Sequence, residues 1–177
     1  MAGQMKDEIE IRPTKPEDLG DIEALYGAAF PDEDLFPLVN ELLAGSDRLL
    51  SLAAVQNKRL VGHVIFTYCS VEPCGRVVAL LGPLCAAPAN QKQGVGSKLV
   101  RRGFEQLDAI HAMVLGDPAY YGRFGFKADD LVETPCPIPS EWKEAWQSVR
   151  LGGDMDEKLA GTLVVPKAWN DPALWSS

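Results

Sequence analysis

A glycine-rich segment between an apolar run and a helical pattern constrains this chain more than any other feature. The segment reads Gln91-Lys92-Gln93-Gly94-Val95-Gly96, the apolar run covers residues 77–86, and the helical pattern begins at Gly94. The first amides of a helix have no intrahelical partner and carry a partial positive charge, so a strand that feeds such a loop suits phosphate. Because Gly94 and Gly96 lack a Cβ, a ligand can approach bare backbone there. The segment therefore predicts an anion site, with contacts that extend to Ser97.

Two better-known phosphate loops do not fit the spacing of these glycines. A nucleotide-hydrolase loop needs a glycine five positions before Gly96, where this chain has Gln91. A dinucleotide-binding loop needs Gly-x-Gly-x-x-Gly, but the next glycine after Gly96 is Gly103. The pattern that remains is Gln91-x-x-Gly94-x-Gly96.

A second motif follows downstream, in the segment Gly116-Asp117-Pro118-Ala119-Tyr120-Tyr121-Gly122-Arg123-Phe124-Gly125-Phe126. Asp117 followed by Pro118 is typical of a helix start, because the carboxylate can cap the first turn and proline suits its backbone angles. Gly125 is a natural helix stop. Tyr121 stands four residues before that glycine, so the pattern predicts a short helix that ends in Phe-Gly-Phe.

Together the two motifs resemble motif A and the Tyr-x-x-x-Gly-Phe segment of the GCN5-related N-acetyltransferases (GNAT). With Leu81-Gly82-Pro83-Leu84 and Val61-Gly62-His63, the pattern is most similar to the small bacterial YhbS-like branch. The resemblance implies one GNAT domain over residues 9–166, with terminal extensions at 1–8 and 167–177. It also implies an α/β (α+β) fold with a mixed, mostly antiparallel central sheet that is splayed between strands 4 and 5 and flanked by helices.

Hydrophobic periodicity predicts the elements along the chain. A capping box at Thr14–Glu17 should start a first helix, and a second helix should end at Gly45. Changes of period predict strands at 50–55, 60–71, 77–86, 109–115 and 161–165, with the strand at 77–86 central because it is apolar on both faces. Residues 142–151 fit a helix by spacing and a strand by the resemblance, and the sequence leaves both open.

Composition limits the class of protein and its partners. The 177 residues suffice for one core, and 46% hydrophobic with 24% charged residues is ordinary for a soluble globular protein. Because no apolar stretch reaches membrane-helix length and residues 1–10 lack a signal-peptide core, we expect a cytoplasmic protein with no membrane partner. The net charge of −8 argues against nucleic-acid binding. A monomer and a homodimer both stay open.

The cysteines do not indicate a metal site. Cys69, Cys74, Cys85 and Cys136 form no Cys-x-x-Cys pair, and the chain has two histidines. Because a structural zinc ion takes four such ligands at short spacings, we expect no metal and four reduced thiols.

The pair Gly82-Pro83 interrupts the central strand. Proline removes a backbone donor and glycine within a strand marks a bulge or a close approach, so the pair predicts a break in the ladder. The resemblance implies that this strand and the strand at 109–115 separate there. It places the pantetheine arm of acetyl-CoA in the wedge, beside Leu84, Cys85 and Ala86.

Acetyl transfer to an amine needs a neutral nitrogen, a polarised thioester carbonyl and a proton for the leaving thiolate. We expect the backbone amide of Leu84 to polarise the carbonyl and Tyr121 to supply the proton, while Tyr120 suits a packing role. Some relatives carry a glutamate base on the central strand, but the corresponding residue here is Leu80. Glu33 and Asp34 are therefore candidate bases acting through water, although a solvated acidic loop explains them equally well.

His63 and Cys85 are two further residues with side chains capable of catalysis. His63 is better explained as a hydrogen-bonded strand histidine than as a base. Cys85 suggests an acyl-cysteine, but nothing near it in sequence would lower its pKa, and the resemblance implies direct transfer. We therefore expect an acetyl-CoA-dependent N-acetyltransferase that acts on a primary amine of a small molecule or a protein. The alternative is a non-catalytic acyl-CoA-binding or interaction module with the same fold.

Overall fold

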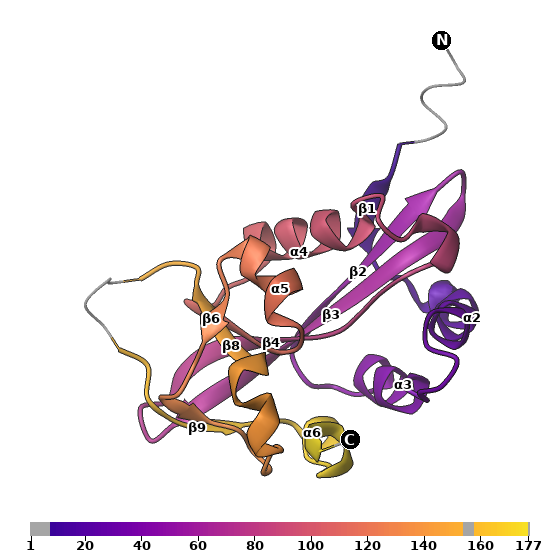
Figure 1. Ribbon diagram of the computed structural model, residues 1–177. Helices are drawn as coiled ribbons and strands as arrows, with labels where there is room; N and C mark the ends of the chain where they lie inside the picture. The colour runs from indigo at the N-terminus through magenta and orange to yellow at the C-terminus, as the bar shows by residue number, and fades with distance from the viewer. Residues whose placement is uncertain (1–7, 154–157, 177) are drawn as a thin grey trace. The chain divides into compact units, whose positions relative to one another are not determined.

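The computed structural model describes residues 8–153 and 158–176, which form two compact units. Unit 1 comprises the chain up to Phe66 together with Gly82–Gln106, and unit 2 comprises Thr67–Leu81 together with the chain from Leu107 onward. Strands β3 (Arg59–Glu72) and β4 (Arg76–Ala86) each contribute residues to both units. Figure 1 labels the helices and strands of both units.

Unit 1 is a sheet covered by helices on both faces. Its strands follow the order β1-β2-β3-β4, and β1 pairs antiparallel to β2. Figure 1 shows α4 on one side of these strands and α2 and α3 on the other. Besides parts of β3 and β4, its elements are β1 (Glu10–Pro13), α2 (Leu19–Ala29), α3 (Phe36–Ala44), β2 (Leu49–Gln56) and α4 (Val95–Gln106).

The start of the first helix differs from the prediction. Thr14 does not cap it, because its amide still pairs with the Ser51 carbonyl of β2 at 3.0 Å and its hydroxyl lies 2.6 Å from Ser51 Oγ. The chain turns one residue later, where the Asp18 carboxylate accepts the Lys15 amide at 2.7 Å and a bidentate pair of bonds from Arg12. The capping box predicted at Thr14–Glu17 is therefore wrong, since strand pairing holds Thr14 extended.

The second helix and the two strands that follow it match the prediction. α3 has Pro37 in its first turn, where the missing amide costs no helical bond, and Gly45 follows its last residue. Between β2 and β3, Asn57 and Lys58 have φ angles of 53° and 65°. Two consecutive residues with positive φ form the kind of two-residue turn whose twist matches antiparallel strands.

Unit 2 is built on a mixed sheet in the order β9-β3-β4-β5-β8-β6, with β7 beside β9. The β4–β5 and β7–β9 pairs are parallel, whereas β5–β8, β6–β8 and β3–β9 are antiparallel. This confirms the mixed, mostly antiparallel sheet. Its further elements are β5 (His111–Leu115), α5 (Pro118–Tyr121), β6 (Lys127–Ala128), β7 (Val132–Glu133), β8 (Trp146–Arg150), β9 (Gly161–Val164) and α6 (Ala173–Ser176).

The stretch that the sequence left open contains both kinds of structure in succession. 3-10 turns cover Ser140–Ala145, and β8 begins directly afterwards. Trp146 is 3% exposed and donates its indole N–H to the Val132 carbonyl at 2.8 Å. Trp175, in the expected C-terminal extension, is 1% exposed and packs edge-on against Trp146 in the same core. The domain limits 9–166 stay a prediction.

The sheet of unit 2 opens where the sequence predicted a break. The ladder between β4 and β5 pairs Ala79 with Ala112 and Leu80 with Met113. Two residues further along β4, Gly82 has a φ of 143°, a conformation that residues with a Cβ rarely adopt. The β4–β5 ladder thus ends before the Gly82-Pro83 pair, where the sequence predicted a break. Among the helices of the described residues, none has the length and apolar character to cross a membrane.

Candidate functional site

The predicted anion loop lies in unit 1, between the end of β4 and the start of α4. Gly94 has a φ of 82°, and the first backbone bond of the helix runs from the Lys98 amide to the Gly94 carbonyl at 3.0 Å. The amides of Val95, Gly96 and Ser97 precede that bond, so no carbonyl within the helix can accept them. The loop therefore presents a set of backbone donors at the positive end of a helix dipole.

Side-chain amides hold this loop in shape. Gln91 Nε2 donates to the Ala86 carbonyl at 3.4 Å, and Gln93 Nε2 donates to the Ala89 carbonyl at 3.2 Å. The two glutamines thus connect the loop to the end of β4 and to the turn that follows it. Because these side chains bond within the protein, we expect Gln91 and Gln93 to contact an anion through their backbone amides. Lys92, between them, is exposed.

A glycine on β3 sets the position of the helix start. A Cβ on Gly62 would lie 2.5 Å from Val95 Cγ1 and 3.2 Å from the Cys85 carbonyl. Only a residue without a side chain lets β3 pass this close to α4, and Val95 is consequently buried. This gives a physical reason for the Val61-Gly62-His63 segment noted in the sequence.

The last three residues of β4 before the loop are Leu84, Cys85 and Ala86. Leu84 and Ala86 are half-buried, while Cys85 is 4% exposed. Burial raises the pKa of the Cys85 thiol to about 12, although hydrogen bonds from the Tyr26 hydroxyl and the His63 amide act in the opposite direction. Cys85 is therefore a protonated thiol at neutral pH.

His63 lies fully buried between two hydroxyl groups. Its Nδ1 is 2.8 Å from the Tyr26 hydroxyl and its Nε2 is 2.8 Å from Ser51 Oγ. Burial lowers the pKa of His63 to about 4, so the ring is neutral at pH 7. The structure confirms a satisfied strand histidine. The sequence carried no sign of its partners, because they stand 12 and 37 positions away.

Tyr121 lies in unit 2, on the short helix that the sequence predicted. Asp117 Oδ1 accepts the Ala119 amide at 3.0 Å, and the helical turns end at Gly125, with a φ of 93°. The Tyr121 ring packs on Gly116 so closely that any Cβ there would collide with it. Burial, followed by the proximity of Tyr120 and Asp117, raises the pKa of Tyr121 well above its ordinary value. The phenol keeps its proton at neutral pH.

Tyr120 has a different environment from its neighbour. Its ring meets Tyr121 edge-on at 5.0 Å between centroids, and the Arg123 guanidinium lies 4.6 Å above it. These contacts agree with the packing role that the sequence analysis assigned to it.

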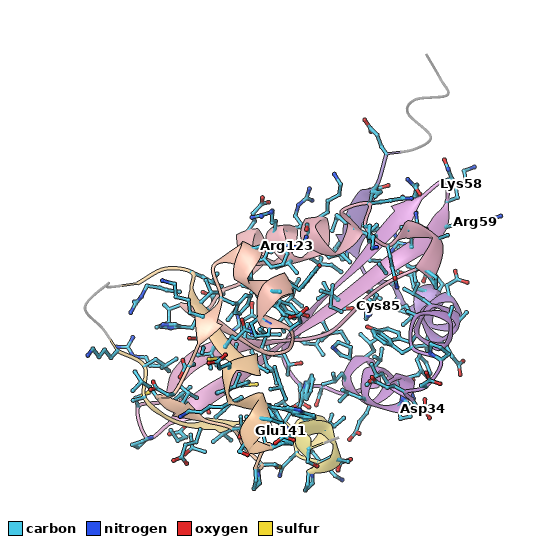
Figure 2. The ribbon with its side chains drawn as sticks, in the orientation of Figure 1. Asp34, Lys58, Arg59, Cys85, Arg123 and Glu141 are labelled. Atoms are coloured by element: carbon cyan, nitrogen blue, oxygen red, sulfur yellow. The ribbon has the colours of Figure 1, made fainter. Side chains whose placement is uncertain are left out.

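The candidate bases lie apart in sequence from both the anion loop and the Tyr121 helix. Glu33 and Asp34 are exposed residues of the loop between α2 and α3, and Figure 2 shows Asp34 at the surface beside these helices. Leu80 is 2% exposed and belongs to the core of unit 2. The structure thus groups residues 84–86 and 91–97 in unit 1 and places Tyr121 in unit 2. Within the described residues, no cluster of His, Cys, Asp or Glu could hold a metal ion.

Comparison with known proteins gives two curated relatives from Escherichia coli strain K12. The chain is 34% identical to the uncharacterised N-acetyltransferase YjhQ over 143 residues, which cover 75% of this chain and 79% of the relative. It is 27% identical to the uncharacterised N-acetyltransferase YhbS over 164 residues, which cover 90% and 98% of the two chains. No protein-family model matches the sequence.

Solved structures also share the fold. Crystalline YhbS from Escherichia coli in complex with CoA has a TM-score of 0.82 and 26% identity, and the match covers 92% of each chain. A GNAT acetyltransferase from Brucella melitensis in complex with acetyl-CoA has a TM-score of 0.74 and 29% identity, covering 92% of this chain and 98% of the other. The fold and these relatives define an acetyltransferase. The chain belongs to the GNAT family of N-acetyltransferases, and the predicted YhbS-like branch is confirmed.

Proposed function

We propose that this protein transfers the acetyl group of acetyl-CoA directly to a primary amine of a small molecule or a protein. The observation that carries the proposal is the set of amides at residues 95–97, which precede the first backbone bond of α4. Such amides suit the oxygens of a pyrophosphate, because the backbone N–H groups and the partial positive charge of the helix start bind an anion without any flexible side chain. The CoA and acetyl-CoA held by the two solved relatives support the same cosubstrate here.

In this proposal, acetyl-CoA spans the loop and the last residues of β4. The pyrophosphate lies on the amides from Gln93 to Ser97, where Gly94 and Gly96 leave the backbone open. The pantetheine arm runs along residues 84–86, and the Leu84 amide donates to the thioester carbonyl. The β4–β5 ladder ends at Leu80, before the residues that this path uses, and this supports the proposal.

The acceptor must lose a proton before it attacks. A lysine-type amine has a pKa of about 10.4 and an α-amino group a pKa of about 8, so the former depends more on a base. Leu80 offers none, and we propose that Glu33 accepts the proton through water. Because an exposed carboxylate is a weak base, we expect the rate to rise with pH toward the pKa of the acceptor itself.

Transfer proceeds without an acyl-enzyme. The amine nitrogen forms a bond to the acetyl carbon and the carbon–sulfur bond breaks. The departing thiolate takes a proton from Tyr121, and the proton that the nitrogen gives up as the amide forms returns to Tyr121 through water. Cys85 does not intervene, because a buried thiol with a pKa of about 12 has almost no thiolate at neutral pH.

A thiol-release assay across a library of primary amines tests this function. We expect CoA release that depends on the acceptor, with initial rates that fit a sequential mechanism. The N-acetylated forms of the same amines are the matched control, because they lack the nucleophile and should release nothing. Mass spectrometry of a treated cell extract would then identify the compound that gains an acetyl group. Tight CoA binding without acceptor-dependent release would instead support the non-catalytic module.

A further inference from the structure

A cavity of about 480 Å³ opens in unit 1 between the β1–α2 connection, the second half of α3 and the start of β2. Its walls are mainly apolar and include Leu19, Leu43 and Leu50. This volume is within the range of small-molecule sites, which combine apolar walls with a few converging polar groups. The residues of the anion loop are not among those that line it.

The polar groups of this cavity are suited to an anion. Thr14, Lys15, Asn40 and Ser51 line it, and Lys15 is the charged residue among its lining side chains. The nearby Asp18 does not offset that charge toward the cavity, because both of its oxygens are taken by Arg12 and one also accepts the Lys15 amide. Hydroxyl, amide and ammonium donors beside apolar walls match a carboxylate that carries an apolar body.

We propose that this cavity is a second ligand site, which binds a small monocarboxylate with an aliphatic body. The carboxylate accepts from Thr14, Asn40 and Lys15, and the aliphatic part contacts the leucines. The site is separate from the acetyl-CoA contacts proposed above, and ligand binding to it does not rest on that proposed function.

A hydrogen-bonded chain leads from this cavity to β4. Thr14 Oγ1 is 2.6 Å from Ser51 Oγ, which is 2.8 Å from His63 Nε2, and His63 Nδ1 is 2.8 Å from the Tyr26 hydroxyl. Tyr26 also neighbours Cys85, and its hydroxyl acts to lower the pKa of that thiol. Because a neutral imidazole carries one N–H, the whole chain can point in one of two directions.

The ligand decides which direction applies. A carboxylate requires Thr14 to donate its hydroxyl into the cavity, so Ser51 must donate to Thr14 and His63 Nε2–H must donate to Ser51. His63 Nδ1 then accepts from Tyr26, whose one hydroxyl proton is no longer available to the Cys85 sulfur. A ligand that donates to Thr14 would impose the reverse order. Occupancy of the cavity is thereby coupled to the strand that carries Leu84 and Ala86, a consequence for catalysis that rests on the proposed function.

Nuclear magnetic resonance of the full labelled chain, without acetyl-CoA, tests the site. The probe is sodium 4-methylpentanoate, compared with 4-methylpentanamide and 4-methylpentylamine, which have the same apolar body. We expect saturable shifts at the amides of Thr14, Lys15 and Ser51, with the tightest binding for the carboxylate. In its complex, the ring nitrogens of His63 should show the proton on Nε2.

Three variants make the test specific. Leu43→Phe fills the cavity and should abolish the shifts while the rest of the spectrum stays folded. Lys15→Gln should weaken binding by up to about fivefold, the range of an exposed ion pair. Lys127→Gln removes the same charge from the surface of unit 2 and should change nothing. Equal binding of the amine or amide, unchanged binding to Leu43→Phe, or no saturable shift would overturn the site. A proton on His63 Nδ1 in the carboxylate complex would overturn the direction of the chain.

Discussion

At the residue scale, two adjacent tyrosines have different structural settings. Tyr121 lies over Gly116, with burial that raises its pKa, whereas Tyr120 is placed between Tyr121 and Arg123. A phenol with a raised pKa stays protonated and can donate a hydrogen bond, but it is a poor acid toward a thiolate. A thiol with an ordinary pKa of about 8.5 also leaves readily without help. We therefore propose that Tyr121 contributes a modest part of the rate.

Replacing Tyr121 by Phe should lower kcat and leave the affinity for CoA nearly unchanged, because the packed ring is kept and the hydroxyl alone is lost. The loss should be at most about 10²-fold, the low end for general acids. The measurement is kcat with saturating acceptor, and Tyr120→Phe is the matched control with little expected effect. Equal rates for wild type and Tyr121→Phe, with product release shown not to limit, would remove Tyr121 from the mechanism.

Cys85 should resist chemical modification in the native protein. Its thiolate fraction is about 10³-fold below that of an ordinary cysteine, given a pKa of about 12. Iodoacetamide at neutral pH should therefore label the exposed Cys74 and spare Cys85, as read by peptide mass spectrometry. Incubation with acetyl-CoA should likewise leave Cys85 unmodified. An acetyl group trapped on Cys85 and consumed by added amine would establish a covalent mechanism instead.

At the element scale, the start of α4 is set by its neighbours rather than by its own sequence alone. Gly62 lets β3 approach Val95, and the side-chain amides of Gln91 and Gln93 bind the loop to the residues before it. The amides of the first turn are thus fixed before any ligand arrives. Such preorganisation lowers the entropy cost of binding a phosphate group.

The Gly96→Val variant should bind CoA more weakly while it remains folded, because a branched Cβ would stand where the ligand meets the backbone. Loss of one charge-assisted bond implies an increase in Kd of about 10- to 100-fold. Calorimetry with CoA measures this. Gly20→Val in α2 is the control, since a Cβ at Gly20 meets nothing within 4 Å. If the folded Gly96→Val protein keeps its affinity, the loop is not the pyrophosphate site.

At the scale of the whole molecule, a buried neutral histidine links stability to pH. The pKa of His63 is about 4 in the folded protein, against about 6.5 for an unperturbed histidine. Between these values the unfolded chain binds a proton and the folded chain does not. The contribution of His63 to the free energy of unfolding is therefore complete above about pH 6.5 and is lost as the pH falls toward 4. The full difference is worth about 3 kcal/mol.

Urea unfolding should show this loss directly. From pH 7 to 4.5 the free energy of unfolding should fall by about 2 to 3 kcal/mol from His63 alone, and His63→Gln should flatten the profile. His111→Gln measures the other histidine, whose pKa is lowered in the same direction by burial and then by Arg150. The pKa of Asp18 is lowered chiefly by its bond to Arg12, so its contribution is lost at lower pH. If the free energy of unfolding of His63→Gln falls with pH as steeply as that of the wild type, His63 is not the source of the pH dependence.

Most elements of the fold could be predicted from the sequence, because local spacing determines them. The apolar strand at 77–86, the glycine loop, the Asp117-Pro118 helix start and the break at Gly82 each depend on residues close together in the chain. Such short segments determine the backbone angles that glycine and proline adopt. They also show the side-chain repeat that distinguishes a helix from a strand. The capping box predicted at Thr14–Glu17 is wrong because a longer-range bond, from Thr14 to Ser51, overrides the local pattern.

The sequence by itself thus determined the family, the fold class and the positions of the two motifs. Tertiary structure alone decided which polar side chains meet in the interior: His63 with Tyr26 and Ser51, and Cys85 with Tyr26. It also decided that burial raises the pKa values of Cys85 and Tyr121. The physical reason is that a pKa and a buried hydrogen bond depend on desolvation and on distant partners, which become neighbours only when the chain packs.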